Sequence, residues 1–413
     1  MSHDAMVSSP ASYAEARRTA GAAATLPPVQ RGLKDSIGGL LTEPITAQLD
    51  IPHTATSAMD GWAVSLTDQP QWRLRGEGAQ RPDAVLEALA PGEAAEIVTG
   101  SPVPAGTHSV LRTEHGQVVS TAAEAAQLRS HSATPDLEPG RNIRPAAAEA
   151  KSGQLLCSPG QVVTPAIAAT AAVAGHDTLT VVPAPRVRLI LTGGEVITSG
   201  IPRIGQVRDV FGLALPAMIS AMGAELADSR RAEDDVAAVV ELIDSASADL
   251  IITTGGTAGS AADVLRPALA RLGAEILVES VQMRPGHPAL LARRGSTLVL
   301  GLPGNPLAGF TALAVLGEPL IRALRGAVPA VTSCTRPAGS DLQGPRAGVR
   351  IIPAQIRDHA VHPVSHSKAH MMRGLAQAHA FAVVPAGGAP AGTPVECLDV
   401  PGASPPARPL QGD

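Results

Sequence analysis

Short runs of apolar residues, each ended by a glycine turn, recur through the middle of the chain. They are Val187–Leu191 before Thr192-Gly193-Gly194-Glu195, Leu250–Thr253 before Thr254-Gly255-Gly256, and Leu298–Leu300 before the turn from Gly301 to Pro306. Apolar runs of this length bounded by turns predict buried strands. Helix-length segments separate them, so we predict βα units around a parallel sheet.

Apolar residues at helical spacing predict the helices of this region. The segments are Val207–Met222, Asp234–Ala246, Ala262–Leu272 and Leu307–Arg325. Pro216 lies inside the first of them and predicts a kink there. Together with the apolar runs, these segments predict a central α/β domain.

Strand-length runs without helical segments flank this region on both sides. They are Gly61–Ser65, Gln71–Arg75, Ala94–Val98 and Ser109–Arg112 before it, and Val349–Ile352, Ala360–Val364, Phe381–Val384 and Val395–Leu398 after it. We therefore predict a mostly β module on each side of the α/β domain. Short helices are predicted at Ser9–Ala24 and Ala166–Ala174, and the first ten residues are expected to be disordered.

Length and composition exclude several classes of function. A chain of 413 residues predicts two to four domains, and 45% hydrophobic residues suffice for their cores. Aromatic residues make up only 1%, which argues against a stacking surface for nucleic acid. The net charge of −5 comes without a basic cluster, so we expect no nucleic-acid partner.

Cysteines and apolar runs bear on the cellular setting. Cys157, Cys334 and Cys397 are far apart in the sequence and predict neither a disulfide framework nor a zinc site. We find neither an unbroken apolar run of about 18 residues nor a signal-peptide pattern. The expectation is a cytoplasmic protein without membrane contact.

The glycine turns predict where a ligand would bind. Backbone N–H groups and helix N-termini converge where parallel strands end, and they attract anions. Gly255, Gly256 and Gly259 would let the backbone close around a phosphate, although a glycine pair after a strand is also an ordinary tight turn. We therefore predict a site for a phosphorylated or otherwise anionic small molecule.

Several motifs, in this order along the chain, resemble those of the molybdopterin molybdenumtransferase family, which includes MoeA and the E domain of gephyrin. They are Thr56 to Val64 (T-S-A-M-D-G-W-A-V), Ile97 to Gly106, Gly140 to Arg144 (G-R-N-I-R), Thr192 to Glu195, Gly205 to Asp209 (G-Q-V-R-D), Arg284 to Pro288 (R-P-G-H-P), Gly301 to Pro306 (G-L-P-G-N-P) and Ala369-His370. The matches extend from about residue 35 to 385.

The resemblance implies four domains and a dimer whose active cleft is built partly by each subunit. The expected boundaries are 1–49 with 137–182 for a discontinuous elongated domain, 50–136 for an inserted β domain, 183–327 for the molybdopterin-binding α/β domain and 328–413 for a small C-terminal β-barrel. This is a multidomain α/β plus β fold.

The resemblance also implies the chemistry. The family inserts molybdate into adenylylated molybdopterin and releases AMP, with a divalent cation, taken here as Mg²⁺, beside the phosphates. Expected partners are the pterin substrate, molybdate, a second copy of the chain, a molybdopterin adenylyltransferase and a molybdoenzyme.

Acidic residues are the first candidates for the site. They are Glu195, Asp263, Asp60 and Asp234 as catalytic residues, with Glu195 and Asp263 holding the cation. Each has a structural alternative: a solvated loop acid for Glu195, a helix N-cap for Asp263, a turn residue for Asp60, and an N-terminal helix acid for Asp234 or its neighbour Asp235.

A second set would hold the pterin and its phosphate. It comprises Thr192, Gly255, Gly256, Gly259, Ser260, Arg284, His287, Pro303 and Asn305. Arg284 and His287 stand where the family pattern has lysines; arginine can bind two oxygens at once, whereas histidine is charged only when protonated. Asn305 could instead simply cap the next helix.

Departures from the family pattern support two alternatives. Gly194, Ala148 and Ala261 replace acids, which favours a catalytically weakened pterin-binding or scaffold paralogue. An enzyme like the molybdopterin adenylyltransferase would share only the central domain, and the matches at Asp60 and Asn142 argue against it. A transition-metal site among His359, His362, His366 and His370 is disfavoured by their spacing and by Pro363.

Overall fold

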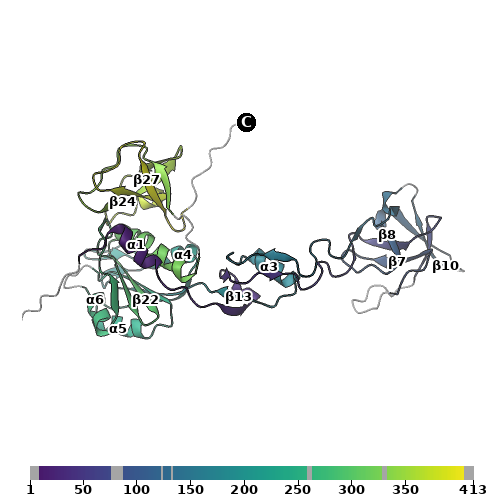
Figure 1. Ribbon diagram of the computed structural model, residues 1–413, viewed down its shortest axis with the longest axis horizontal. Helices are drawn as coiled ribbons and strands as arrows, with labels where there is room; N and C mark the ends of the chain where they lie inside the picture. The colour runs from purple at the N-terminus through teal and green to yellow at the C-terminus, as the bar shows by residue number, and fades with distance from the viewer. Residues whose placement is uncertain are drawn as a thin grey trace, which may run out of the picture. The chain divides into compact units, whose positions relative to one another are not determined.

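The computed structural model describes residues 9–75, 87–121, 124–131, 134–257, 263–327 and 333–403. The chain divides into two compact units, drawn in Figure 1. The smaller unit comprises Gln30–Ile37 and Glu43–Thr180, and the larger comprises Met1–Val29, Gly38–Thr42 and Val181–Asp413. The four domain boundaries expected from the family stay a prediction.

A six-stranded sheet forms the main part of the smaller unit. Its strands, in the order β8-β5-β7-β6-β10-β9, are Thr107–Arg112, Gly61–Ser65, Glu93–Ile97, Gln71–Leu74, Glu124–Ser130 and Gly116–Thr121. Ala63 and Val64 belong to separate core clusters because successive side chains on a strand point to opposite faces. The four predicted strands are confirmed; the β9–β10 hairpin was missed because it lacks an apolar alternation.

Short elements complete the smaller unit. They are α2 (Leu33–Ser36), β3 (Ile45–Thr46), β4 (Thr56–Ser57), η1 (Thr113–His115), η2 (Pro135–Leu137), β11 (Ile143–Arg144), β12 (Leu155–Cys157) and α3 (Pro165–Val173). The helix predicted at Ala166–Ala174 is confirmed as α3, whose first turn is capped by the Thr164 hydroxyl accepting from the N–H of Ile167 at 3.2 Å. The chain first leaves the larger unit within β1 (Val29–Gly32), returns to it for Gly38–Thr42, which includes β2 (Leu40–Leu41), and finally re-enters it within β13 (Thr178–Val182).

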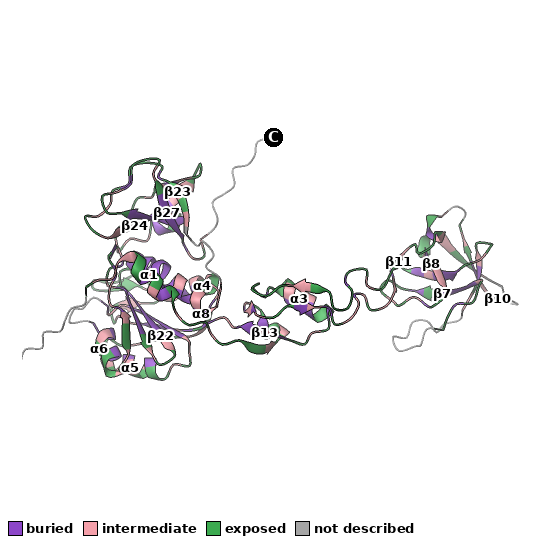
Figure 2. Cartoon of the chain, in the orientation of Figure 1, coloured by how far each residue is buried: buried purple, intermediate pink, exposed green. Residues whose placement is uncertain are grey.

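A second six-stranded sheet is the framework of the larger unit. Its order is β17-β14-β18-β22-β21-β19, formed by Glu225–Arg231, Arg186–Leu191, Leu250–Thr254, Thr297–Leu302, Leu290–Arg294 and Glu275–Val278. The first four strands are parallel, and β21 and β19 are antiparallel. The predicted parallel core is therefore confirmed, and Figure 2 shows its buried strands in purple.

Helices cover both faces of this sheet. They are α1 (Tyr13–Gly21), α4 (Phe211–Ala221), α5 (Val236–Asp244), α6 (Leu265–Arg271), α7 (Pro306–Ala312) and α8 (Glu318–Leu324), with a π-helix, Leu313–Gly317, between the last two. One apolar cluster contains the buried residues of α1, α4, α7 and α8, and another contains those of α5 and α6. Ile251 and Ile252, neighbours on β18, point into different clusters, as side-chain alternation requires.

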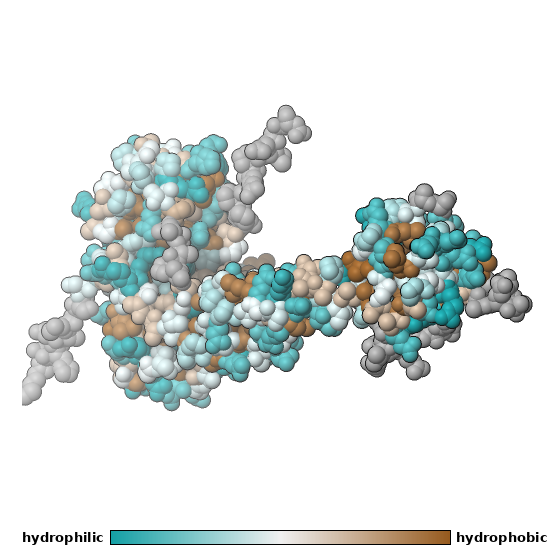
Figure 3. Space-filling view, turned by 45° about the vertical axis from the view of Figure 1, so that its right-hand side comes forward, coloured by the Kyte–Doolittle hydropathy of each residue, from teal (hydrophilic) through white to brown (hydrophobic). Residues whose placement is uncertain are grey.

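The apolar helix from Pro306 to Leu324 is a core helix. By length and composition alone, its 19 residues could cross a bilayer. However, 78% of an 18-residue stretch of this helix is buried inside the protein. It is the only such helix in the described part of the chain. On the face drawn in Figure 3, hydrophobic atoms form separate patches among hydrophilic ones.

A small β domain follows the α/β region. It contains β23 (Ser333–Pro337), β24 (Val349–Arg357), β25 (Ala360–Pro363), β26 (Ala380–Pro385), β27 (Pro394–Asp399) and the short η4 (Leu375–Gln377), with β20 (Met283–Arg284) joined to β24. The four strands predicted here are confirmed. Cys334 lies directly opposite Cys397 across β23 and β27, a pairing that their distance in sequence did not indicate, and both are free thiols.

Two expectations in the α/β region were wrong in detail. Val207 and Arg208 form strand β16, which pairs with β15 (Val196–Ile197), so the predicted helix begins only at Phe211. Strand β17 was missed because its sequence, Glu-Leu-Ala-Asp-Ser-Arg-Arg, is polar; it is an edge strand with one side of its ladder unpaired. The first eight residues lie outside the described part, so their expected disorder stays a prediction.

Candidate functional site

A cavity of about 720 Å³ lies at the carboxyl edge of the parallel strands of the larger unit. Strands β14, β17, β18 and β22 end at Leu191, Arg231, Thr254 and Leu302, and residues at or directly after each end line the cavity. Parallel strands end at one edge of a sheet, so turns that are distant in sequence meet there. The cavity brings together these predicted residues: Thr192, Glu195, Asp234, Gly255, Gly256, Pro303 and Asn305.

The turn after β14 presents Glu195 to the cavity. Gly193 has φ of 116°, a left-handed conformation suited to glycine, and a Cβ there would meet a Val196 methyl at 2.8 Å. The N–H of Val196 donates to the Gly193 carbonyl at 3.1 Å, and the N–H of Val207 donates to the Glu195 carbonyl at 3.0 Å. The backbone of Glu195 is thus held, while its carboxylate has no hydrogen-bond or ion-pair partner among the described residues.

Asp234 holds this turn from the neighbouring segment. One carboxylate oxygen accepts from the N–H of Gly193 at 3.0 Å, and the other accepts from the N–H of Gly194 at 2.8 Å. Asp235 instead caps α5, accepting from the N–H of Ala238 at 3.0 Å. The structure therefore separates two adjacent acids that the sequence left open: Asp234 faces the cavity and positions the Glu195 turn, and Asp235 is the helix cap.

The glycine turn after β18 also lines the cavity. Gly255 and Gly256 have φ of 84° and 64°, and the N–H of Gly255 donates to the Leu302 carbonyl at 2.9 Å. The Thr192 hydroxyl donates to the Thr254 carbonyl, which ties the turns after β14 and β18 together. Asn305 precedes α7 without a side-chain capping bond. Gly259 and Ser260 lie outside the described residues.

Asp263, Arg284 and His287 do not line this cavity. The Asp263 carboxylate accepts from the N–H of Arg266 at 3.2 Å and pairs with its guanidinium at 3.3 Å, at the start of α6. The Nδ1 of His287 lies 2.7 Å from the Val281 carbonyl, and Arg284 belongs to the short strand β20. Of the Arg284–Pro288 motif, only Pro288 reaches the cavity.

Other polar residues of the cavity were missed as site candidates. Arg208 belongs to the β15–β16 pairing and Asp209 directly follows it, and Arg231 ends β17. The G-Q-V-R-D motif was recognised in the sequence, but Val207 and Arg208 were predicted to be helical. Arg208 was therefore not expected to line a cavity. His370, considered in the sequence only as part of a motif and of the disfavoured histidine cluster, also lines the cavity, and the Ala369 carbonyl beside it accepts from the N–H of Ala308 at 3.2 Å.

A metal site built from protein groups alone is absent from the ranges the structure describes: within them, no three His, Cys, Asp or Glu side chains gather closely enough. The histidines between residues 359 and 370 do not form such a group within those ranges either.

Three motifs of the smaller unit meet around Asp60. Its carboxylate accepts from the N–H of Thr99 at 2.7 Å and from the Thr99 hydroxyl at 2.9 Å. The bond from the Thr99 N–H, with that from its hydroxyl, lowers the pKa of Asp60 below its usual value. A Cβ on Gly61, where φ is 150°, would lie 2.0 Å from the Leu111 carbonyl oxygen, so glycine is required beside Asp60.

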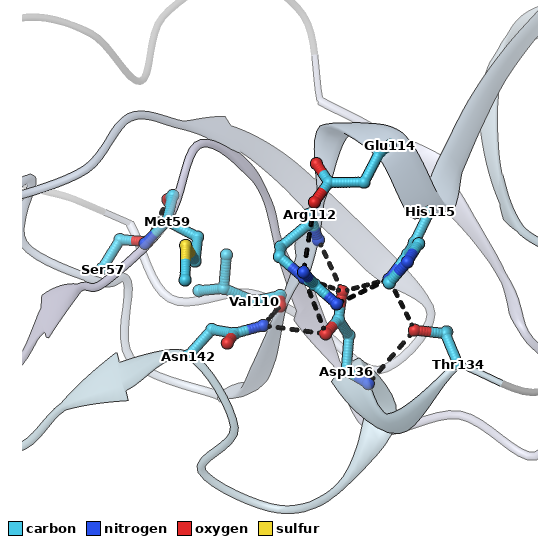
Figure 4. Close-up of polar contacts among 9 residues, drawn as sticks. All are labelled: Ser57, Met59, Val110, Arg112, Glu114, His115, Thr134, Asp136 and Asn142. Carbon is cyan, nitrogen blue, oxygen red and sulfur yellow. Dashed lines mark hydrogen bonds and ion pairs between the residues drawn. The ribbon is translucent and has the colours of Figure 1, made fainter.

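The loop that carries Asp60 rests on a buried polar cluster centred on Asp136, shown in Figure 4. Asp136 is 1% exposed and accepts from the N–H and Nε of Arg112 and from the amide of Asn142, each at 3.1 Å. The Nδ1 of His115 lies 2.8 Å from the same carboxylate. The carbonyl of Asn142 in turn accepts from the N–H of Ala58 at 2.8 Å, so the cluster supports the Asp60 loop.

Opposing effects act on the Asp136 carboxyl. Burial raises its pKa, but the hydrogen bonds from Arg112, His115 and Asn142 outweigh burial and bring the pKa to about 2. Asp136 is therefore ionised throughout the neutral range. The cluster is a satisfied structural network, in contrast to the cavity.

Comparisons with known proteins cover most of the chain. Residues 11–175 match the family described as the MoeA N-terminal region (domain I and II), 188–323 a probable molybdopterin binding domain, and 335–400 the MoeA C-terminal region (domain IV). Molybdopterin molybdenumtransferase 2 of Mycobacterium tuberculosis is 30% identical over 378 residues, which is 87% of this chain and 91% of that protein.

Further relatives agree. Molybdopterin molybdenumtransferase of Nostoc sp. is 33% identical over 307 residues, covering 70% of this chain and 67% of the relative. The crystal structure of a molybdopterin biosynthesis MoeA protein from Pyrococcus horikosii superposes with a TM-score of 0.66 at 21% identity, covering 96% of this chain and all of that one (100%). This last likeness is one of fold.

The matches define the class first: a multidomain fold with sheet-rich domains and an α/β domain that matches the probable molybdopterin binding domain. Within that class, the chain belongs to the molybdopterin molybdenumtransferase family. The family, the fold class and the enzyme class predicted from the motifs, a transferase of molybdenum cofactor biosynthesis, are thereby confirmed.

Proposed function

We propose that this protein releases AMP from adenylylated molybdopterin and inserts molybdate into the pterin, using the carboxyl-edge cavity of the larger unit. The observation that carries the proposal is Glu195: this residue lines the cavity on a braced backbone, and its carboxylate has no partner among the described residues. A carboxylate without a protein partner in a cavity is available to a ligand.

The cavity suits an anionic substrate. Helix α4 begins at Phe211 and the helix Pro306–Leu324 begins beside Asn305, and both of these starts line the cavity. The N-terminal turn of a helix carries unsatisfied N–H groups and a partial positive charge. The glycine turns at Gly255 and Gly304 keep side-chain bulk away from the same region. These features support binding of the phosphates of an adenylylated pterin.

Mg²⁺ fits the donor chemistry of the cavity. Magnesium prefers oxygen ligands and is commonly held by one or two carboxylates together with substrate phosphates. Glu195 supplies such a carboxylate, whereas both oxygens of Asp234 already accept hydrogen bonds from the Glu195 turn. When bound, the cation would offset charge that develops on the phosphates. The chain's own contribution is to orient Glu195 and to hold the substrate in the cavity.

A homodimer would complete the site. Asp60 and Thr99 form a hydrogen-bonded pair on the surface of the smaller unit, and the family resemblance implies that this region of one copy serves the cavity of another. We expect the enzyme to act in the cytoplasm, to receive its substrate from a molybdopterin adenylyltransferase and to deliver its product to a molybdoenzyme.

The test follows AMP release from adenylylated molybdopterin by the full-length protein, with magnesium and molybdate present. Wild-type protein is expected to release AMP and the Glu195→Gln variant to lose this activity while its melting temperature stays unchanged. Glu233→Gln is the matched control, because Glu233 is also exposed but does not line the cavity. If wild type and Glu195→Gln released AMP at the same rate, the proposal that the cavity is the active site would be wrong.

A pterin-binding scaffold is the second candidate. Gly194 stands where the family has an acid, and its N–H is occupied by Asp234, while Asp263 is turned toward Arg266. Few acids therefore remain available for turnover. Tight binding of adenylylated molybdopterin without AMP release, in wild type and Glu195→Gln alike, would identify the scaffold.

A further inference from the structure

Two arginines lie in the wall of the cavity, on strands that the apolar pattern did not predict. Arg231 is the last residue of β17, and Arg208 is the second residue of β16. Both arginines belong to the larger unit and line the same cavity as Glu195. A cavity built to hold an anion needs positive charge of this kind, because the chain as a whole carries a net charge of −5.

Arg231 is held in place by Asp209. One oxygen of the Asp209 carboxylate pairs with the Arg231 guanidinium, and the other accepts from the N–H of Gly212 at 2.8 Å. A Cβ on Gly212 would come within 2.4 Å of that carboxylate, so glycine leaves the space that Asp209 needs. The guanidinium has five N–H donors, and pairing with one carboxylate oxygen leaves donors for a ligand.

Arg208 is next to the Glu195 turn but does not pair with it. The β15–β16 pairing sets Arg208 opposite Ile197, and the N–H of the preceding Val207 donates to the Glu195 carbonyl. Within the described ranges, neither the Arg208 guanidinium nor the Glu195 carboxylate has a hydrogen-bond or ion-pair partner. Opposite charges that share a cavity without pairing suit a ligand that brings a cation and an anion together.

We propose that Arg231, positioned by Asp209, and Arg208 bind the tetrahedral oxyanion of the substrate, which leaves Glu195 for the cation. The assignment rests on the proposed function and adds its anion-binding residues. The oxyanion has two sources with the same chemistry, the phosphate of the nucleotide part and molybdate itself. Arginine suits both, because its planar fork donates to two oxygens of one anion.

The experiment measures equilibrium binding of AMP, adenosine and molybdate to the full-length chain and to Arg231→Gln and Arg208→Gln. The chain offers a matched control for each variant. Arg230 is the neighbour of Arg231 on β17 and also pairs with an aspartate, Asp228, but it does not line the cavity. Arg203 is exposed like Arg208 and lies in the connection that leads from β15 to β16, outside the cavity lining.

Each cavity substitution is expected to raise the dissociation constant of the oxyanion about 10- to 100-fold, the usual effect of losing a charge-assisted hydrogen bond. Arg230→Gln and Arg203→Gln are expected to change it less than about threefold, by loss of long-range attraction only. The dissociation constant of adenosine, which has no phosphate, should be the same for the wild type and all variants. Weakening confined to AMP identifies the nucleotide phosphate as the ligand, and weakening confined to molybdate identifies molybdate; either supports the assignment.

Asp209 is tested as a positioning residue by a double-mutant cycle. Asp209→Asn should weaken oxyanion binding in the wild-type background and add nothing in the Arg231→Gln background, because it acts through Arg231. A purely structural Asp209 would lower stability equally in both backgrounds without this coupling.

The two proposals fail in different ways. If the wild type releases AMP from adenylylated molybdopterin while Arg231→Gln and Arg208→Gln bind AMP and molybdate like their controls, the arginine assignment is overturned and the proposed function stands. Wild-type protein that binds neither anion and releases no AMP would remove both.

Discussion

The carboxyl-edge cavity and the Asp136 cluster differ in whether their charged groups have hydrogen-bond or ion-pair partners. In the cluster, the buried Asp136 carboxylate is satisfied by Arg112, His115 and Asn142. In the cavity, Glu195 and Arg208 share a space and contact neither each other nor, within the described ranges, another polar partner. The difference indicates which charges stabilise the fold and which are available to a ligand.

Removing the carboxylate of Glu195 should have the largest effect on activity. We expect Glu195→Gln to lower the rate of AMP release on the order of 100-fold, as when one electrostatic contact in an active site is lost. Its melting temperature should match that of the wild type, because the Glu195 side chain has no described partner to lose. Steady-state kinetics checks the rate of AMP release, and calorimetry on the same preparations checks the melting temperature. A large fall in melting temperature would show that Glu195 stabilises the fold and would contradict its assignment as a group available to a ligand.

Asp136→Ala should instead lower the stability of the smaller unit. Truncating Asp136 removes the buried carboxylate that Arg112, His115 and Asn142 contact, and breaking a buried charge network in this way typically costs about 3 kcal/mol. Urea unfolding followed by Trp72 fluorescence reports on the smaller unit, where this tryptophan is buried. Asp68→Ala, an exposed acid of the same unit, is the control and should leave the unfolding midpoint in place.

Acid should weaken the Asp136 cluster over a defined range. The folded pKa of Asp136 is about 2, below its ordinary 3.8, so the ionised carboxyl stabilises the fold above pH 3.8. That contribution, about 2 kcal/mol, is lost as the pH falls from 3.8 toward 2. Urea midpoints measured between pH 5 and 2 should decline more steeply for the wild type than for Asp136→Asn, and parallel curves would refute the assignment.

The smallest effect is expected at Asp263, whose carboxylate contacts Arg266 at the start of α6. Asparagine accepts the same backbone N–H as aspartate but loses the ion pair with Arg266, so Asp263→Asn should lose less stability than Asp263→Ala, which should lose about 1 kcal/mol. AMP release by Asp263→Asn should stay within about threefold of the wild type. A loss comparable with that of Glu195→Gln would instead show that Asp263 holds the cation, as the family resemblance implies.

Much of the fold was predictable because it depends on local patterns. Apolar runs ending in glycine turns are confirmed as β14, β18 and β22, and the alternating runs are confirmed as strands of the two β regions. β17 was missed because an edge strand can be polar, and the Arg231 at its end was missed with it. Arg208 was likewise missed as a site residue, because helical periodicity predicted a helix where the structure has the β15–β16 pairing.

The sequence by itself determined the order of the elements, the turns that end the parallel strands and the family, because these depend on residues close together in the chain. Only the tertiary structure decided which charges are paired. Asp234 holds the turn of Glu195 across 41 residues, and Asp209 holds Arg231 across 22. Such contacts depend on how strands align in the folded sheet, so no local pattern distinguishes a carboxylate that braces a loop from one that is available to a substrate.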